Sequence, residues 1–356
     1  MKWKMQKLAD ICTIKTGKLD SNAAIPGGEY PFFTCAPETF RINTFTFDTE
    51  AVLLAGNNAS GIFPLKYYEG KFDAYQRTYV LESIYKDRLM VKFLYYTFIL
   101  LLEYFQSVSI GAATQYLTKI ILNNLSVPIP PMATQEKIVF RLSAYDDMIE
   151  NNRRRMALLE EAARLLYQEW FVHLRFPGHE RTRIINGVPE GWERKTLGDQ
   201  INLFYGKSLK SDMRVDGPFP VYGSSGIVGT HEKALVKGPA IIVGRKGNVG
   251  SVYWSNKDFY AIDTVFFINA ETSNLYLYFA MKEMHFISTD GAVPGLNRDF
   301  AYSRSLIVPA KPVLQQFYET AEPLFNLMES LQQMNQKLRS ARDLLLPRLM
   351  SGEIAV

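Results

Sequence analysis

The alternation of apolar and polar positions predicts two unusually long amphipathic helices. In each, apolar residues recur at alternating spacings of four and three, the pattern of a helical seam that packs against another helix. The first seam comprises Ile138, Leu142, Tyr145, Ile149, Asn152, Met156, Leu159, Ala163, Leu166 and Trp170. The second comprises Phe317, Ala321, Leu324, Met328, Leu331, Asn335, Leu338, Arg342, Leu345 and Leu349, each 179 residues after its counterpart. At about 1.5 Å per residue, each helix should be roughly 50 to 60 Å long.

Both predicted helices have similar start signals and one asparagine in the seam. Each begins after a proline-rich stretch, because proline ends a strand and is tolerated at a helix start. The first should run to about Val172, and the second should be interrupted at Pro347 and stop soon after. One asparagine stands in each seam, Asn152 and Asn335. Such a residue fixes the register of paired helices at some cost in stability, or else it is a solvated position near a fraying seam.

The two helices close the halves of an internal duplication. Trp3, Leu8 and Gly17 are echoed 189 residues later, and "YPFFT" at 30–34 meets "FPVYG" at 219–223 with the same displacement. Three further matches follow, with displacements that shrink to 180: "AVLLAG" at 51–56 with "PAIIVG" at 239–244, 93–96 with 275–278, and 110–117 with 290–297. Small deletions in the loops of the second copy account for this orderly drift.

The duplication predicts a mixed α/β protein with two globular halves. The helices need each other to bury their seams, and an antiparallel coiled-coil pair would hold one globular half at each end with approximate two-fold symmetry. A segment rich in proline and glycine, "RFPGHERTRIINGVPEGWE", links the first helix to the second copy.

Composition is consistent with such a protein. With 356 residues, 47% of them hydrophobic, the chain can bury two cores, and the longest apolar run, 93–102, is too short to cross a bilayer and predicts a buried helix. The two cysteines, Cys12 and Cys35, and four scattered histidines indicate neither a disulfide framework nor a zinc site. We expect a cytoplasmic protein without a membrane partner. The net charge of +4 permits a nucleic-acid partner without demonstrating one.

No catalytic constellation is recognisable. "YGKS" at 205–208 lacks the first glycine of a phosphate loop and predicts a turn at a strand, and the glycines of 244–251 do not have dinucleotide-binding spacing. The latter segment is either a surface turn or a loop that presents Arg245, Lys246 and Asn248 to a polyanion. The sequence therefore favours binding over catalysis, with neither a cofactor nor a metal.

Polar side chains in the matched loops are of the kinds that pair with base edges, although each, taken singly, is more typical of a turn or a helix cap. The candidates in the first copy are Asn57, Asn58, Ser60, Gln76, Arg77, Thr114 and Gln115. Those in the second copy are Arg245, Lys246, Asn248, Asp263, Thr264, Asn297 and Arg298. Candidates for phosphate contacts are Lys18, Lys119, Lys207 and Lys210. The copies share their apolar framework and differ at these polar positions, as two modules that read different targets would.

These features resemble the specificity subunits of type I restriction-modification systems. "RLLYQEWFVHLRFPGHE" at 164–180 is similar to the end of that family's central conserved region, and "LLLPRLMSGEI" at 344–354 is similar to its closing phrase. The resemblance implies a non-catalytic subunit with two target recognition domains, each binding half of a split double-stranded DNA sequence. We expect these domains at 1–131 and 192–311, a central helix at 132–175, a linker at 176–191 and a C-terminal helix at 312–356.

The resemblance also implies partners. The helices would act as a ruler and as docking sites for two methyltransferase subunits, which bring S-adenosylmethionine, and restriction subunits would cleave. The second copy departs from the first, because "DGAVPGLNRD" lacks the Thr-Gln of "GAATQYL", which puts equivalent contacts there in doubt. Two alternatives stay open: a solitary methyltransferase or nuclease, and a purely structural coiled-coil adaptor.

Overall fold

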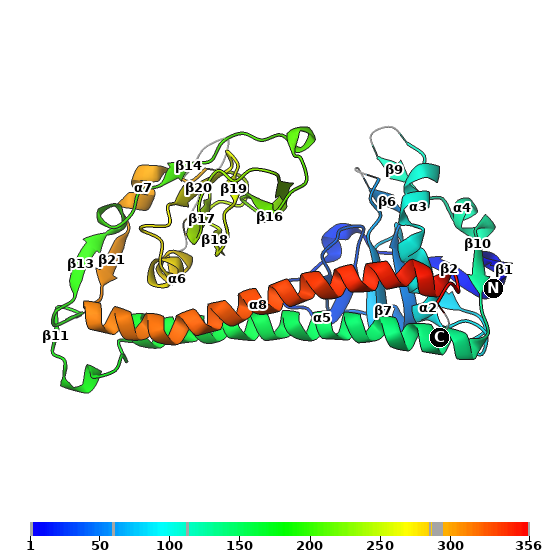
Figure 1. Ribbon diagram of the computed structural model, residues 1–356, viewed down its shortest axis with the longest axis horizontal. Helices are drawn as coiled ribbons and strands as arrows, with labels where there is room; N and C mark the ends of the chain where they lie inside the picture. The colour runs from blue at the N-terminus through cyan, green and yellow to red at the C-terminus, as the bar shows by residue number, and fades with distance from the viewer. Residues whose placement is uncertain (1–2, 59–60, 112–113, 285, 287–294, 355–356) are drawn as a thin grey trace. The chain divides into compact units, whose positions relative to one another are not determined.

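The computed structural model describes residues 3–58, 61–111, 114–284, 286 and 295–354. These form two compact units (Figure 1). Unit 1 comprises Met1–Asn151 and Asn335–Val356, and unit 2 comprises Asn152–Met334. Each unit therefore contains one copy of the duplicated sequence together with part of each long helix, α5 (Met132–Tyr167) and α8 (Lys311–Met350).

Unit 1 is built on one six-stranded mixed sheet. Its order is β2 (Cys12–Thr16), β8 (Thr78–Ser83), β5 (Phe47–Ala55), β7 (Leu65–Ala74), β3 (Tyr30–Phe33) and β4 (Phe40–Ile42). All neighbours are antiparallel except β3 and β7. Two small ribbons complete the strands, β1 (Lys4–Lys7) with β10 (Ser126–Ile129) and β6 (Asn57–Asn58) with β9 (Gln115–Tyr116).

Unit 2 repeats this topology in two sheets. The first has the order β14 (Phe204–Tyr205), β20 (Val265–Ile268), β17 (Ala240–Gly244) and β18 (Val252–Ser255), and the second has β16 (Gly226–His231), β15 (Phe219–Gly223) and β19 (Tyr260–Ala261). The single strand β7 thus corresponds to β18 plus β19, and β15 pairs with β19 in parallel as β3 does with β7. Two ribbons accompany them, β13 (Glu193–Thr196) with β21 (Ser305–Val308) and β11 (Ile184–Ile185) with β12 (Val188–Pro189).

The core of unit 1 joins the sheet to helices from distant parts of the chain. The second half of β5, residues 51–55, is buried on both faces, with Val52 and Leu54 directed to the helical side. There they meet α2 (Val91–Leu100), the buried helix that the apolar run predicts. The same cluster contains Ile138 and Leu142 from the first half of α5, and Leu346, Leu349 and Met350 from the end of α8. Figure 1 shows these red last turns of α8 beside the start of α5. The short helices of this unit are α1 (Leu8–Ile11), α3 (Leu102–Val108) and α4 (Lys119–Asn124).

The core of unit 2 uses the complementary helix ends. Helix α5 continues past Tyr167 as a π-helical turn over Gln168–Val172, which agrees with the predicted end of the first helix. Tyr167 and Phe171 pack against Phe317 of α8, with ring centroids 6.4 and 5.0 Å apart. Helix α6 (Leu275–Glu283), the counterpart of α2, lies in the same cluster, and α7 (Arg298–Tyr302) precedes β21.

The predicted seams are the inward positions of α5 and α8. Every member of both seams is buried or half-buried. Asn152 and Asn335 are 4% and 2% exposed, which excludes the solvated alternative, and Asn335 donates a hydrogen bond to the carbonyl of Ile149. The predicted interruption at Pro347 is wrong. Proline removes one helical hydrogen bond, and α8 nevertheless continues to Met350 because Leu349 and Met350 gain burial in the core.

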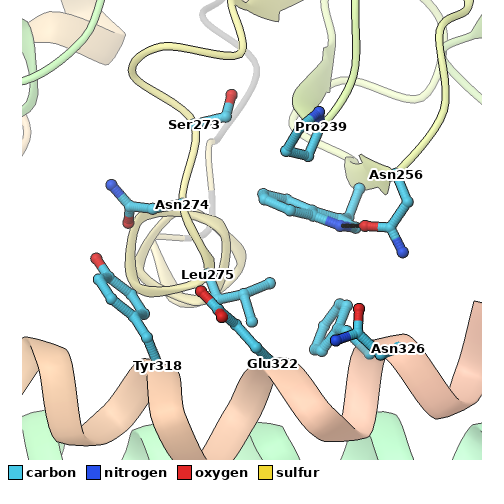
Figure 2. Close-up of a pocket in the computed structure, with 10 residues that line it drawn as sticks. Pro239, Asn256, Ser273, Asn274, Leu275, Tyr318, Glu322 and Asn326 are labelled. Atoms are coloured by element: carbon cyan, nitrogen blue, oxygen red, sulfur yellow. Dashed lines mark hydrogen bonds between the residues drawn. The ribbon is translucent and has the colours of Figure 1, made fainter.

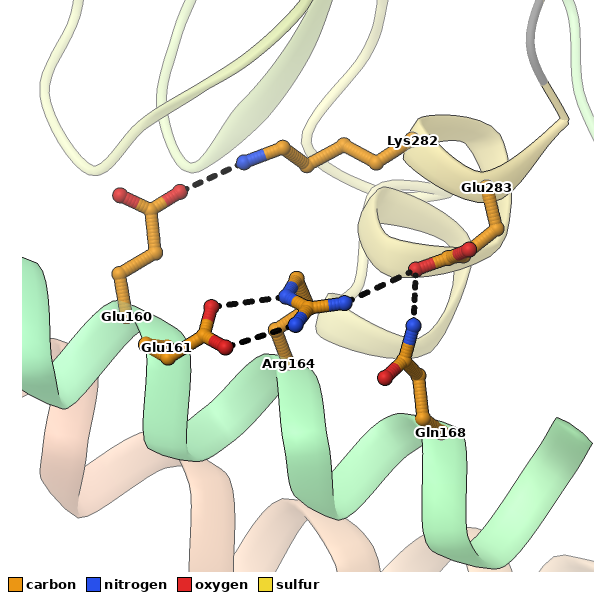
Figure 3. A network of polar contacts seen from close by, with 6 residues as sticks. All are labelled: Glu160, Glu161, Arg164, Gln168, Lys282 and Glu283. Atoms are coloured by element: carbon orange, nitrogen blue, oxygen red, sulfur yellow. Dashed lines mark hydrogen bonds and ion pairs between the residues drawn. The ribbon is translucent and has the colours of Figure 1, made fainter. Parts of the chain in front are cut away.

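Different polar contacts join the counterpart helices α2 and α6 to the long helix α5 in the two units. In unit 1, Asp146 of α5 accepts from the Tyr96 hydroxyl at 2.6 Å and pairs with Arg342 of α8 at 2.5 Å. In unit 2, Glu160 of α5 accepts from the Lys282 ammonium at 2.7 Å (Figure 3). It also accepts from the Tyr278 hydroxyl at 2.9 Å.

Figure 3 shows further polar contacts between α6 and the residues that follow Glu160. The guanidinium of Arg164 binds Glu161 on its own helix and lies 3.6 Å from Glu283 of α6, which also accepts from Gln168 at 2.9 Å. Helix α6 is thereby attached to two successive turns of α5 and to the π-helical turn that follows them. No helix in the described ranges combines the length and apolar character that a membrane crossing requires.

Replacing Glu160 by Gln should lower the free energy of unfolding by about 1 kcal/mol at pH 7, because one charge-assisted bond is weakened at a site where both side chains are about one-third exposed. Burial acts to raise the pKa of Glu160, but the hydrogen bond and charge of Lys282 outweigh it and hold the pKa below its usual value. The ionised form thus stabilises the fold above the unfolded-state pKa of about 4.3, and this contribution disappears as the pH falls through the lower folded-state pKa.

Urea unfolding at pH 7 and at pH 3 measures this difference. The wild-type and Glu160→Gln curves should converge at the acid pH, since the amide resembles the protonated acid. Glu190→Gln, at an exposed carboxylate of the same unit, is the control and should follow the wild type. An equal gap at both pH values would contradict the assignment.

Candidate nucleic-acid interface

In unit 1, the candidate side chains gather around the small ribbon of β6 and β9. Asn57 lies opposite Tyr116 and Asn58 opposite Gln115. The ribbon is attached to the main sheet at Gly56, whose N–H donates to the carbonyl of Arg77 and whose carbonyl accepts from Leu117. A Cβ atom at Gly56 would lie 2.5 Å from the Arg77 oxygen, so only glycine permits this approach.

Aromatic and amide contacts arrange the side chains of this cluster. The guanidinium of Arg77 lies 5.5 Å from the ring centroid of Tyr116, and Arg77 is exposed. Gln115 accepts from Ser109 at 2.9 Å and donates to the carbonyl of Gly111 at 2.7 Å. The oxygen and the nitrogen of its side-chain amide therefore both form hydrogen bonds within the loop.

The other predicted residues of the first copy differ in their surroundings. The Oδ1 atom of Asn57 is buried and has no hydrogen-bond partner among the described residues. Gln76 is exposed and donates to Asp20 at 2.8 Å, away from the ribbon. Thr114 is half-buried beside Gln115, and Ser60 lies outside the described residues. The structure thus brings Asn57, Asn58, Arg77, Thr114 and Gln115 together.

In unit 2, backbone hydrogen bonds bring three loops to one place. The N–H groups of Arg245 and Lys246 both donate to the carbonyl of Thr264, at 2.9 and 3.1 Å. The N–H of Leu296 donates to the carbonyl of Arg245 at 2.8 Å, next to Asn297 and Arg298 in sequence. The loops that the sequence matched to the first copy are therefore assembled here as well.

Two arginines of this cluster share one aromatic ring. The guanidinium groups of Arg245 and Arg298 lie 5.2 and 5.6 Å from the centroid of Tyr205, which is 52% exposed. Arg245 also donates through Nε and Nη2 to the carbonyl of Asp263, at 3.1 and 2.6 Å. The contact uses the side of the guanidinium that carries Nε, so the edge between its terminal nitrogens Nη1 and Nη2 stays available to another acceptor.

Some second-copy candidates have structural roles. Asn297 caps α7, because its Oδ1 accepts from the N–H of Phe300 at 3.0 Å. Thr264 Oγ1 accepts from the N–H of Ser224 at 3.3 Å. The side chains of Lys207, Lys246, Asn248 and Asp263 are exposed. Within the described residues no three histidine, cysteine or acidic side chains gather as metal ligands.

Equivalent glycines position the loop after the first sheet strand in both units. A Cβ at Gly17 would lie 1.7 Å from the carbonyl oxygen of Ala74, and one at Gly206 would lie 2.0 Å from that of Ile262. Lys18 and Lys207, both proposed for phosphate contacts, follow these glycines directly. The backbone course that presents them is the same in each copy.

Sequence reasoning missed the two tyrosines that orient the arginines, Tyr116 and Tyr205. Tyr116 lies in "GAATQYL", which was chosen for its Thr-Gln pair, and Tyr205 lies in "YGKS", which was considered as a phosphate loop. Both tyrosines are exposed. An aromatic residue that flanks a turn and is left exposed is the available signal, but only the fold shows which cation lies over its ring.

Comparison with known proteins identifies a protein family whose model matches this chain. The model of the type I restriction modification DNA specificity domain matches residues 1–161 and 189–340, once in each copy of the duplication. The specificity subunit of the type I restriction enzyme EcoDI of Escherichia coli is 40% identical over 154 residues, which are 43% of this chain and 33% of that protein.

Longer matches include the specificity subunit of the type I restriction enzyme MjaIX of Methanocaldococcus jannaschii. It is 26% identical over 311 residues, 76% of this chain and 71% of that protein. Among solved structures, the S subunit of a type I restriction-modification system from Mycoplasma genitalium superposes with a TM-score of 0.56. That match covers 98% of this chain and 96% of the other, and at 19% identity it supports the fold alone.

The glycine contacts generate a test of how this surface is built. Gly206→Ala should lower the free energy of unfolding by about 1 to 3 kcal/mol, because the added methyl group would overlap a backbone oxygen. Gly295→Ala is the matched control in the same surface, since its Cβ would lie an ordinary 3.5 Å from the Arg245 carbonyl. Thermal and urea unfolding compare the two variants, and equal stability would show that this loop does not depend on the close approach.

Proposed function

We propose that this chain, which belongs to the family of type I restriction-modification DNA specificity proteins, reads two separate half-sequences of double-stranded DNA, one with each unit. The observation that carries the proposal is the repeated topology with unlike polar clusters. Equivalent loops meet in both units, yet one cluster is rich in amides with a single arginine and the other has two arginines on one tyrosine.

The chemistry of the clusters supports base reading. Amides pair with adenine and arginine pairs with guanine in the major groove, so unlike clusters select unlike sequences. Tyrosine beneath a guanidinium restricts its orientation without neutralising its charge, which keeps the group available to an anion or a base edge. Exposed lysines such as Lys207 and Lys246 suit phosphate contacts that position the duplex.

The remaining parts have proposed roles in a larger complex. Recognition domains at 1–131 and 192–311 would be joined through a central helix at 132–175, a linker at 176–191 and a C-terminal helix at 312–356. The two helices would form an antiparallel coiled coil that sets the distance between half-sites and docks two methyltransferase subunits. Those subunits would supply S-adenosylmethionine, restriction subunits would cleave, and this chain would act in the cytoplasm without catalysing either reaction.

Exchange of one recognition domain tests the proposal as a whole. Residues 1–131 are replaced by the equivalent part of another family member, the chain is expressed with its methyltransferase, and the methylated sequence of the host DNA is determined. One half of the motif should change, while the other half and the number of unspecified base pairs between them stay the same. A change in both halves would contradict the two-module reading, and a changed gap would show that the helices do not set the spacing.

Arg245 offers a test at the level of one side chain. Arg245→Ala should weaken binding of the methyltransferase complex to its target by about 1 to 3 kcal/mol and relax one base position, because the two terminal nitrogens match the edge of guanine. Affinities are measured for single-base variants of the target at several salt concentrations. Lys207→Ala, at an exposed lysine of the same unit, should instead weaken all sequences alike and reduce the salt slope by about 1. The same uniform pattern for Arg245→Ala would make it a phosphate contact.

A further inference from the structure

Unit 2 contains a small cavity that none of the DNA-directed residues lines. It has a volume of about 220 Å³ and lies between the start of α6, strand β18 and one face of α8 (Figure 2). Figure 2 shows Tyr318, Glu322 and Asn326 rising from α8 toward the residues of the strands and of α6. Trp254 and Phe325 complete the wall.

The aromatic part of the wall is rigidly held. The ring of Trp254 packs against Phe325 and Tyr278, with centroids 6.1 and 5.9 Å away. Its indole N–H donates to the side chain of Asn256. The tryptophan therefore needs no rearrangement to offer a flat surface to a ligand.

Glu322 is the one acidic residue that lines the cavity. Its side chain is exposed and has no hydrogen bond or ion pair with the described residues. Burial and, after it, the charge of Glu322 raise the pKa of the Tyr318 hydroxyl, which agrees with their proximity in Figure 2. The cavity thus combines aromatic faces with one carboxylate that lacks a cation.

The duplication shows what occupies the same place in unit 1. Val52 lies between Tyr67 and Leu81 in the sheet, and Ile241 lies between Trp254 and Ile268. Both Val52 and Ile241 face the helical side of their units. The sequence match of 51–56 with 239–244 pairs Val52 with Ala240, but Ala240 faces the other side of the sheet, so by orientation Ile241 corresponds to Val52. Tyr67 and Trp254 therefore hold corresponding places on the helical face of their sheets.

A lysine of unit 1 covers that counterpart ring. Lys92, in the first turn of α2, places its ammonium 5.3 Å from the centroid of Tyr67, and the Tyr67 hydroxyl donates to Glu50 at 2.7 Å. The aligned position at the start of α6 is Asn274, which caps the helix by accepting from the N–H of Leu277. Unit 2 thus has an aromatic ring at this place, its carboxylate Glu322 comes from α8 and not from the sheet, and none of the described residues that line the cavity is cationic.

We propose that the cavity of unit 2 accepts an arginine side chain of a partner protein, with the guanidinium against Trp254 and paired with Glu322. A planar guanidinium stacks on indole and binds a carboxylate with two parallel hydrogen bonds, whereas an ammonium does neither. A free polyamine fits less well, because its several charges would meet a single carboxylate. The proposal is independent of DNA reading, since it shares no residue with either polar cluster.

The dipole of α6 does not prevent a cation from binding in the cavity. The positive end of a helix dipole disfavours a nearby cation, and the cavity borders the start of α6. Lys92 nevertheless lies in the first turn of α2 with its ammonium over the ring of Tyr67, so a cation is tolerated beside an aromatic ring at this helix start.

The test titrates the full chain with N-acetyl-arginine amide and follows the fluorine resonance of 5-fluorotryptophan at position 254, assigned by its loss in Trp254→Phe. The resonance should shift saturably, and N-acetyl-citrulline amide, which has the same shape without charge, should produce no saturable shift. Glu322→Gln should weaken binding at least tenfold, while Glu319→Gln, one turn away on α8 and outside the cavity, should leave it unchanged.

A second pair of variants fills the cavity from within. Asn274→Lys restores the lysine of unit 1 and should abolish binding of the arginine probe, whereas Asn274→Ala loses the same helix cap and should retain it. The proposal is overturned if the citrulline probe binds equally well, if Glu322→Gln binds like the wild type, or if Asn274→Lys still binds. Tighter binding of spermidine than of the arginine probe would identify a polyamine site instead.

Discussion

The burial of one apolar sheet face in each unit is the constraint on which this structure depends. In unit 1 that face is covered by α2 and then by residues from the start of α5 and the end of α8, Ile138, Leu142, Leu346 and Leu349. In unit 2 it is covered by α6 and by Ala163, Tyr167, Phe317 and Ala321 from the opposite ends of the same helices. Neither copy of the duplicated sequence therefore contains all of the residues that complete its core. The folding units and the sequence repeats have different boundaries.

Polar contacts make this sharing of helices selective. Asp146 has its cation, Arg342, on the other long helix, whereas the residues at the equivalent positions in unit 2 are Phe325 and Ala163. If α5 paired with the α5 of a second chain in place of α8, Asp146 would lie opposite Ala163, and a half-buried carboxylate without its partner is destabilising. The apolar seams are nearly interchangeable, so the distinction between correct and incorrect pairing falls on these charged residues and on the buried asparagines.

Periodicity in the sequence was sufficient to find the duplication, both long helices and the buried helix α2, because each depends on which face of an element is apolar. It could not show which distant segment covers that face, so the division of each helix between two units had to come from the structure. The end of α8 was misjudged for a related reason, since burial of Leu349 compensates for the hydrogen bond lost at Pro347. The same limit applies to the interface. Loop composition indicated Arg77 and Arg245, but their placement over Tyr116 and Tyr205 follows from contacts between segments far apart in sequence.

The interface loops can diverge because their backbone atoms hold them together. The N–H groups of Arg245 and Lys246 bind one carbonyl, that of Thr264, and Gly56 is attached through its own N–H and carbonyl. The glycines at 17 and 206 set the course of a loop by having no side chain at all. Substitution of the exposed side chains between these points changes neither the hydrogen bonds nor the close approaches, so it alters the polar surface at little cost to the fold. The exchange of Lys92 for Asn274 follows the same physical rule, since the first turn of α2 fixes the backbone of Lys92 and the cap of α6 fixes that of Asn274. A scaffold held by its backbone thus allows its two copies to acquire different binding chemistry while the cores stay alike.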